Sequence, residues 1–366
     1  VDTGKTAKSD SITAKFKGIF IKNNSNSFTT SPDWLSGNIV EEEPNYIRDG
    51  KSSQQIITAE QIQKILVHIE DSNQQKPTEF ASKFFDDFIF RGIRGKGGFG
   101  CVFEVVNKYD KFDYAVKRIA VSMNKLDESL TEVCKMATLD HPRIVRYNCT
   151  WIEEPPPGWQ NQMDFEKLEG MQSNFKDDDV FIYIQMQLYK NSLGDWLEEN
   201  QTEFSRVPSR IKSWFREIVT AVQYLHDRNI IHSDLKPANI LLDDTDHVKL
   251  CDLGIATERN IENGEEMTIS RSPICSPIYS SPEQLSVFTR YSSKTDVFAL
   301  GLIFAELTFV MTPEERQSIF DNYRDGTPLH ELFESNTAEF IAWLATKDSK
   351  DRPRCIEILS HPFLAI

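Results

Sequence analysis

The residues with the clearest chemical potential lie in the segment 231–239, which reads IHSDLKPAN. Asp234 is followed two positions later by Lys236 and five positions later by Asn239, and Asp252 opens an Asp-Leu-Gly triplet thirteen residues further on. A carboxylate can take the proton of a hydroxyl group, a lysine can neutralise a phosphate, and amide and carboxylate oxygens can bind magnesium. This order predicts phosphoryl transfer, with Asp234 and Lys236 as catalytic residues and Asn239 and Asp252 as ligands of Mg²⁺.

A glycine-rich segment upstream could hold the phosphates of a nucleotide. It consists of Gly95, Lys96, Gly97, Gly98, Phe99, Gly100, Cys101 and Val102. The pattern alone is weak evidence, because dinucleotide-binding folds also use it. Strand-like residues follow these glycines, however, whereas a dinucleotide-binding unit would begin a helix there. The segment is therefore predicted to be a phosphate-binding turn that enters a strand.

A lysine and a glutamate complete this upstream half. Lys117 ends the strand-like run at 114–117, and Glu132 lies in the helical-looking stretch 126–139, where it could pair with the lysine. Taken separately, these features could be an ordinary hairpin loop, a surface lysine and a solvated glutamate. The occurrence of all these features in this order favours a single site for phosphoryl transfer.

Together these motifs resemble those of the eukaryotic protein kinases, over roughly residue 84 to the C-terminus. The resemblance implies an α+β, bilobal fold: an N-lobe at 85–187, made of an antiparallel sheet plus one helix, and a mainly helical C-lobe at 190–366. ATP would bind between them. Lys236 is the residue that Ser/Thr kinases carry two positions after the base, so the resemblance favours Ser/Thr specificity.

The same resemblance implies roles for further residues. Val102, Ala115 and Leu241 would enclose the adenine ring, Met186 would be the gatekeeper, and Gln187 and Leu188 would form the hinge. Arg94 stands where an aliphatic residue usually covers the base, so either its methylene stem covers the ring or the loop is unusually mobile. Three residues would be structural: Glu283 would pair with Arg352, and Asp296 would hold the backbone of the catalytic loop.

Several runs, among them DYAVKRI at 113–119 and PPPGWQ at 155–160, are similar to the kinases that phosphorylate the α subunit of translation initiation factor two. Within that family they are most similar to the endoplasmic-reticulum stress member. The implied substrate is a serine of the factor, bound partly by the helix around 314–323, and its phosphorylation would lower translation initiation. No RNA-binding domain is visible in the chain.

Family members are activated by phosphorylation and by dimerisation through their N-lobes. Ser276 is the corresponding phosphosite candidate, and Lys83, Asp87 and Tyr147 are the candidates for the contact in a homodimer. Ordinary surface charges and a half-buried tyrosine explain the last three equally well. Ser233 replaces the arginine that normally grips the activating phosphate, so either phosphorylation activates less steeply here or Arg259, Arg271 or Lys249 takes over that role.

Composition limits the other functions. The chain has 366 residues, a net charge of −15 and 39% hydrophobic residues, which suits a two-lobed globular protein. The acidic charge argues against direct binding of nucleic acid. Its six cysteines include no Cys-x-x-Cys pair, which favours reduced thiols over disulfides or a zinc site.

Two segments fall outside the kinase motifs. Residues 1–84 are predicted to be a linker with a short amphipathic helix near 58–71, and residues 154–180 form an insertion between strand-like runs at 146–152 and 180–187. No apolar run is long enough to span a membrane. Because the chain begins with valine, we expect it to be a fragment. The pattern of cysteines favours a cytosolic location for this fragment. The full-length protein is expected at the endoplasmic-reticulum membrane, attached only through regions outside this chain.

Three functions stay open from the sequence. The first is an active kinase of the initiation factor, and the second is a Ser/Thr kinase with another protein substrate. The third is a pseudokinase scaffold, suggested by Ser233 and the acidic insertion. The intact set of Lys117, Glu132, Asp234, Asn239 and Asp252 disfavours the third, because a scaffold would be expected to lose a catalytic group.

Overall fold

The computed structural model describes residues 80–97, 100–252, 257–258, 260–262, 265–269, 277–286, 290–327 and 335–365. Several predicted features lie outside these ranges. They are the amphipathic helix near 58–71, Gly98 and Phe99 of the glycine-rich segment, the phosphosite candidate Ser276, and Arg259 and Arg271.

The N-terminal lobe is built on one antiparallel sheet in the order β1-β2-β3-β5-β4. The strands are β1 (Phe88–Gly97), β2 (Gly100–Asn107), β3 (Asp113–Ser122), β4 (Tyr147–Glu153) and β5 (Asp179–Gln187). Helix α4 (Leu126–Ala137) follows β3, after the 3-10 turn η1 (Met123–Lys125), and packs against β3 and β4. The predicted α+β, bilobal fold is confirmed, with one sheet and one long helix in this lobe.

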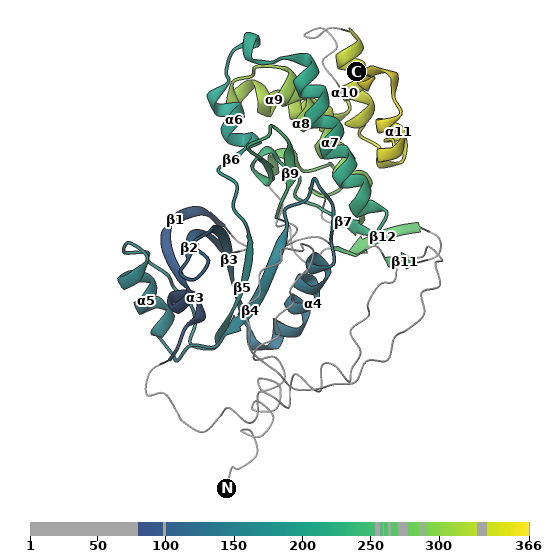
Figure 1. Ribbon diagram of the computed structural model, residues 1–366. Helices are drawn as coiled ribbons and strands as arrows, with labels where there is room; N and C mark the ends of the chain where they lie inside the picture. The colour runs from purple at the N-terminus through teal and green to yellow at the C-terminus, as the bar shows by residue number, and fades with distance from the viewer. Residues whose placement is uncertain are drawn as a thin grey trace, which may run out of the picture.

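Alternation along β5 gives the sheet two apolar faces. Phe181 and Tyr183 join a cluster on one face, while Ile182 and Ile184 join a second cluster that α4 covers. Side chains of a strand point alternately to opposite faces, so a run of buried residues must serve both. Figure 1 shows α4 on one side of the sheet and helices α3 (Lys83–Asp87) and α5 (Trp159–Lys167) on the other.

Helix α3 is part of this lobe because Phe84 is buried in the first cluster, with its ring 5.2 Å from that of Tyr183. Glu153 fixes the start of α3, since its carboxylate accepts hydrogen bonds from the backbone N–H of Phe84 at 2.9 Å and the hydroxyl of Ser82 at 2.6 Å. The packed chain therefore begins a few residues before position 85, the predicted start of the kinase domain.

The second lobe is mainly helical and surrounds one apolar core, with α8 almost entirely buried at its centre. Its helices are α6 (Leu193–Glu199), α7 (Pro208–His226), α8 (Lys294–Thr308), α9 (Pro313–Asp325), α10 (Ser335–Leu344) and α11 (Cys355–Leu359). Its strands are β6 (Asn191–Ser192), β7 (Ile230–Ile231), β8 (Ile240–Leu242), β9 (Val248–Leu250), β10 (Thr257–Glu258), β11 (Asn260–Glu262), β12 (Glu265–Ile269) and β13 (Arg290–Tyr291). Its 3-10 turns are η2 (Glu203–Ser205), η3 (Pro237–Asn239), η4 (Pro277–Tyr279), η6 (Ser349–Asp351) and η7 (Pro362–Leu364).

Within the described ranges, none of the helices combines the length and the apolar character that a bilayer crossing requires.

Candidate active site

The catalytic segment lies between β7 and β8, and a buried carboxylate fixes its backbone. Asp296, on α8, is 1% exposed and accepts hydrogen bonds from the backbone N–H groups of His232 and Ser233, both at 2.9 Å. His226 lies 2.8 Å from the same carboxylate. Burial alone would raise the pKa of Asp296, but the hydrogen bond with His226 and the nearby backbone donor outweigh it and hold the pKa below its usual range. Asp296 is therefore an ionised anchor for this loop.

Ser233 has a backbone conformation that places Asp234 beside its neighbours. Its φ angle is +67°, in the left-handed region that non-glycine residues rarely adopt. The Nζ atom of Lys236 lies 2.7 Å from Oδ2 of Asp234, and the side-chain amide of Asn239 donates to the backbone carbonyl of Asp234 at 2.8 Å. The three predicted residues thus converge within one loop.

Asp252 connects the two lobes, because its carboxylate forms an ion pair with Lys117 of β3. Burial acts to raise the pKa of Asp252, but the charge of Lys117 outweighs it and the pKa is lowered. Asp252 has a φ angle of +59°, the second left-handed residue in the site. The predicted partner of Lys117, Glu132, lies on α4, but its side chain is outside the described part of the structure.

The donor set at this point fits a magnesium ion. Mg²⁺ prefers oxygen ligands, and an ionised Asp252 provides a carboxylate. The amide nitrogen of Asn239 is hydrogen-bonded to Asp234, which leaves its amide oxygen as the atom suited to a cation. In the described residues no cluster of three or more His, Cys, Asp or Glu residues forms a separate metal site.

The glycine-rich segment runs from the end of β1 into β2. Gly100 has a φ angle of +116°, and a Cβ atom there would lie 2.1 Å from the carbonyl oxygen of Arg118, so this position requires glycine. Arg94 donates from Nε to Glu104 on β2 at 2.7 Å, which directs its guanidinium toward the neighbouring strand. The other described residues of this segment lie on the same two strands: Gly95, Lys96 and Gly97 are on β1, and Cys101 is on β2.

The residues predicted around adenine come from four strands. Val102 is on β2 and pairs with Lys117, and Ala115 on β3 pairs with Met186 on β5. Leu241 lies on β8 in the second lobe. Strand β5 ends at Gln187, so Leu188 begins the connection between the lobes, as a hinge would.

The segment that follows η4 is hydrogen-bonded both to the core of the second lobe and to the catalytic loop. Glu283 accepts two hydrogen bonds from Arg352, at 2.6 and 2.9 Å, and this pairing outweighs the effect of burial and lowers the pKa of Glu283. Gln284 donates to the carbonyl of Ser233 at 2.8 Å. Neither Gln284 nor His226 is among the residues predicted for the site, and the only signal for Gln284 is its position directly after the predicted Glu283.

Two of the three candidate dimer residues pair with each other within one chain, and the third is buried. Lys83 and Asp87 form an ion pair with each other along α3, and Tyr147 on β4 is only 4% exposed. Lys249, one of the proposed replacements for the missing arginine, donates to the carbonyl of Pro142 at 2.7 Å and so is engaged elsewhere.

Comparison with known proteins places this site in a family. Residues 88–364 match the family model described as protein kinase domain. The interferon-induced, double-stranded RNA-activated protein kinase of Mus musculus is 30% identical over 97% of this chain and 66% of its own length. The eIF-2-alpha kinase GCN2 of Rattus norvegicus is 26% identical over 77% of this chain and 25% of its own length.

A third relative is the eukaryotic translation initiation factor 2-alpha kinase pek-1 of Caenorhabditis elegans, 32% identical over 54% of this chain and 20% of its own length. The chain thus spans less than two thirds of each of these relatives. The family model covers most of the chain, and the geometry brings Lys117, Asp234, Asn239 and Asp252 together. The chain belongs to the protein kinase family, as an ATP-dependent protein kinase related to the eIF2-alpha kinases.

Proposed function

We propose that this protein is a Ser/Thr kinase that transfers the γ-phosphate of ATP to a serine of the translation initiation factor two α subunit and thereby lowers translation initiation. The kinase activity in this proposal rests on one observation, the ion pair between Lys117 of the first lobe and Asp252 of the second. This ion pair lies beside the loop that contains Asp234. The substrate is inferred from the names of the relatives, two of which are kinases of this factor.

In the proposed reaction, the oxygen of the substrate serine attacks the γ-phosphorus, and the bond from that phosphorus to the bridging oxygen of ADP breaks. Asp234 accepts the proton of the serine hydroxyl, and Lys236, 2.7 Å from Asp234, balances charge on the transferring phosphoryl group. Asn239 and Asp252 would hold Mg²⁺, which neutralises phosphate charge when bound. Lys117 would contact the α- and β-phosphates.

Incubation with Mg-ATP and purified initiation factor two, beside an Asp234→Asn control, tests the proposal. Label on a serine of the α subunit that the control lacks would support it. Label only on the kinase itself or on other proteins would refute the substrate and retain a Ser/Thr kinase. If neither protein is labelled, the chain is a scaffold rather than an enzyme.

Two finer proposals accompany this function. We propose an N-lobe homodimer in which Lys83 and Asp87 exchange their present intrachain partner for one in a second copy. Arginine, the family's residue, would offer two parallel hydrogen bonds where Lys83 offers a point charge, so the contact is expected to be weak. Sedimentation equilibrium of wild type and Asp87→Lys tests it, since equal dimerisation of both would exclude this pair.

The second finer proposal is an endoplasmic-reticulum location for the full-length protein, which follows from the sequence similarity to the stress member. The double-stranded RNA-activated relative aligns with far more of this chain than the pek-1 relative does. Fractionation of cells that express the full-length protein distinguishes these relationships: recovery in the cytosol alone would exclude the membrane location.

A further inference from the structure

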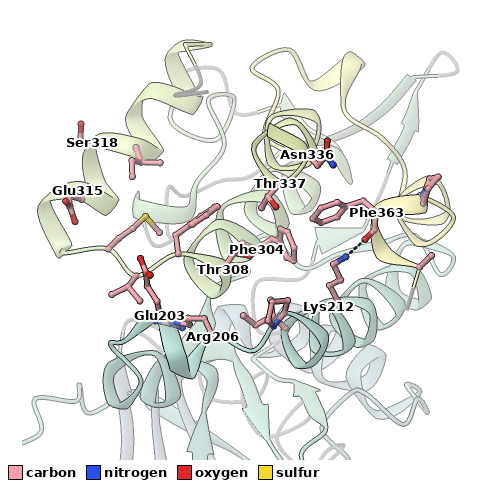
Figure 2. A pocket seen from close by; sticks show the side chains of 18 of the residues that line it. Glu203, Arg206, Lys212, Phe304, Thr308, Glu315, Ser318, Asn336, Thr337 and Phe363 are labelled. Atoms are coloured by element: carbon pink, nitrogen blue, oxygen red, sulfur yellow. Dashed lines mark hydrogen bonds between the residues drawn. The ribbon is translucent and has the colours of Figure 1, made fainter. Parts of the chain in front are cut away.

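Two features of the described structure lie outside the predicted catalytic set, and they differ in their relation to the nucleotide site. Figure 2 shows the first, a cavity of about 1060 Å³ that is lined by residues of the second lobe, none of them predicted to bind ATP. The second is the insertion between β4 and β5, which contains α5. Helix α5 lies beside α3, on the side of the first lobe where β1 and β2 form the glycine-rich segment (Figure 1). The insertion is therefore placed to act on that segment.

The stretch that follows α5, residues 171–175, is fixed to that helix by two side chains. The amide nitrogen of Asn161 donates to the carbonyl of Phe175, and the amide oxygen of Asn161 accepts from the N–H of Phe175, both at 3.0 Å. The hydroxyl of Ser173 donates to the buried carboxylate of Asp164. These hydrogen bonds make residues 171–175 a fixed part of the lobe surface.

This fixed stretch reaches the glycine-rich segment at Lys96. The Nζ atom of Lys96 donates to the carbonyl of Gln172 at 3.4 Å, which is a long hydrogen bond. The neighbouring Met171 is 9% exposed and belongs to the same buried apolar cluster as Cys101 of β2. Because Lys96 and Cys101 lie opposite each other in β1 and β2, the insertion supports both strands at the base of the turn.

Strand β1 alone gives this end of the turn little support. Its pairing with β2 shifts register between Phe90 and Gly92 and again between Ile93 and Gly95. Residues 93–97 are all exposed. A segment with irregular pairing and little burial opens at a low cost in free energy, so contacts from a neighbouring element decide how well it is ordered.

We infer that the insertion is a positioning element for the phosphate-binding turn, with Asn161 and Met171 as positioning residues that do not touch the nucleotide. The backbone N–H groups of a glycine-rich turn bind phosphates when they converge on one place. A turn that is already held in this shape loses less conformational entropy when ATP binds, so the insertion raises the affinity for ATP. This role rests on the ATP-binding part of the proposed function and not on the identity of the protein substrate.

Titration of the whole chain with Mg-ATP and with adenosine tests this inference, because adenosine has no phosphates for the turn to bind. Asn161→Ala removes both hydrogen bonds to Phe175, and Met171→Ala removes packing in the cluster of Cys101. Each variant is expected to weaken Mg-ATP binding about fivefold or more and to change adenosine binding less than about twofold, since the ordered turn contributes to phosphate binding alone. Phe165→Ala, at a position of α5 that is 61% exposed, is the matched control and should bind both ligands like wild type.

Hydrogen–deuterium exchange at the backbone amides of residues 95–101 gives a second readout. Without nucleotide, this exchange should be faster in Asn161→Ala than in wild type. Equal weakening of ATP and adenosine binding would overturn the inference, because it indicates general damage to the lobe, and so would an unchanged ATP affinity in both variants. If Asn161→Ala does not fold, the same comparison with Met171→Ala decides. A wild-type chain that binds neither ligand would refute the proposed function together with this inference, whereas the other outcomes leave that function standing.

Discussion

Asp234 is surrounded by groups that stay in place when its charge is removed. Lys236 and the amide of Asn239 both contact its Oδ2 atom, and Asp296 and Gln284 hold the backbone of the preceding residue, Ser233. An asparagine at this position can still accept hydrogen bonds through its amide oxygen. The site is therefore built so that its base can be tested without disturbing its geometry.

We expect Asp234→Asn to lower kcat about 10²- to 10⁴-fold, the usual contribution of a general base. The KM for ATP should change little, because Asp234 faces the acceptor hydroxyl rather than the nucleotide. Steady-state kinetics and a thermal unfolding curve measure both effects. A variant with normal folding and near-normal kcat would show that Asp234 is not the base.

A second prediction concerns Ser233 and activation by phosphorylation. Where kinases of this kind carry an arginine, the serine hydroxyl is buried and has no hydrogen-bond partner in the described structure. A phosphate on Ser276 would then lack its usual anchor, and Lys249 is engaged with the carbonyl of Pro142. Ser276→Ala is expected to lower kcat less than about tenfold, since no strong charge-assisted contact is lost.

The matched test adds Ser233→Arg. In that background, kcat should become sensitive to Ser276→Ala, because an anchor for the phosphate now exists. A collapse of about a thousandfold in Ser276→Ala alone, the scale of losing an essential electrostatic contact, would contradict the weak switch.

Among the secondary-structure elements, α5 shows how the insertion is fastened to the lobe. Asp164 is 0% exposed and pairs with both terminal nitrogens of Arg118 on β3, at 2.6 and 2.5 Å. Gln160 donates to the same carboxylate at 2.7 Å. The rings of Phe103, Phe175 and Phe181 lie around the guanidinium. The insertion is thus integrated into the sheet face rather than looped away from it.

Asp164→Asn is expected to lower the free energy of unfolding by about 3–5 kcal/mol, because it leaves Arg118 buried without its counter-charge. Glu166→Gln, exposed on the same helix, is the control and should stay within about 0.5 kcal/mol of wild type. Urea denaturation followed by fluorescence measures both. A loss below about 1 kcal/mol in Asp164→Asn would mean that the insertion is not held by this pair.

The elements also show what the sequence could and could not predict. Asp234, Lys236 and Asn239 lie within six residues of one loop, so their spacing nearly determines their distances, and the unbroken apolar run of β5 indicates its burial on both faces. The pairing of Arg118 with Asp164 joins residues 46 positions apart in two elements, and neither has a pattern that reveals a partner. Likewise, the sequence suggested Glu132 for Lys117, whereas the described contact is with Asp252.

On the scale of the whole molecule, buried carboxylates link stability to pH. The pKa values of Asp252, Glu283 and Asp296 are all lowered: burial opposes this in each case, and Lys117, Arg352 and His226 respectively outweigh it. Because the pKa values are lower in the folded state, the carboxylates of the unfolded chain take up protons at a higher pH than those of the folded chain when the pH is lowered. The stabilisation is therefore complete above the unfolded pKa values, about 4, and is lost as the pH falls through the folded values.

We expect the free energy of unfolding to change little through these three groups above about pH 5 and to fall steeply below pH 4, by up to about 1.4 kcal/mol per pH unit for each group. Urea unfolding between pH 7 and pH 3 measures this dependence. Glu283→Gln should be less stable at pH 7 and should show a shallower decline in acid. An equal slope for the variant and wild type would exclude Glu283 as a contributor.

The position of Asp296 has a consequence for the opening motions of the molecule. The amide protons of His232 and Ser233 point at a carboxylate in the most deeply buried helix of the second lobe, so solvent deuterium can reach them only when that helix separates from the loop. The backbone beside the catalytic aspartate should thus exchange as slowly as the core of α8, although it belongs to a loop.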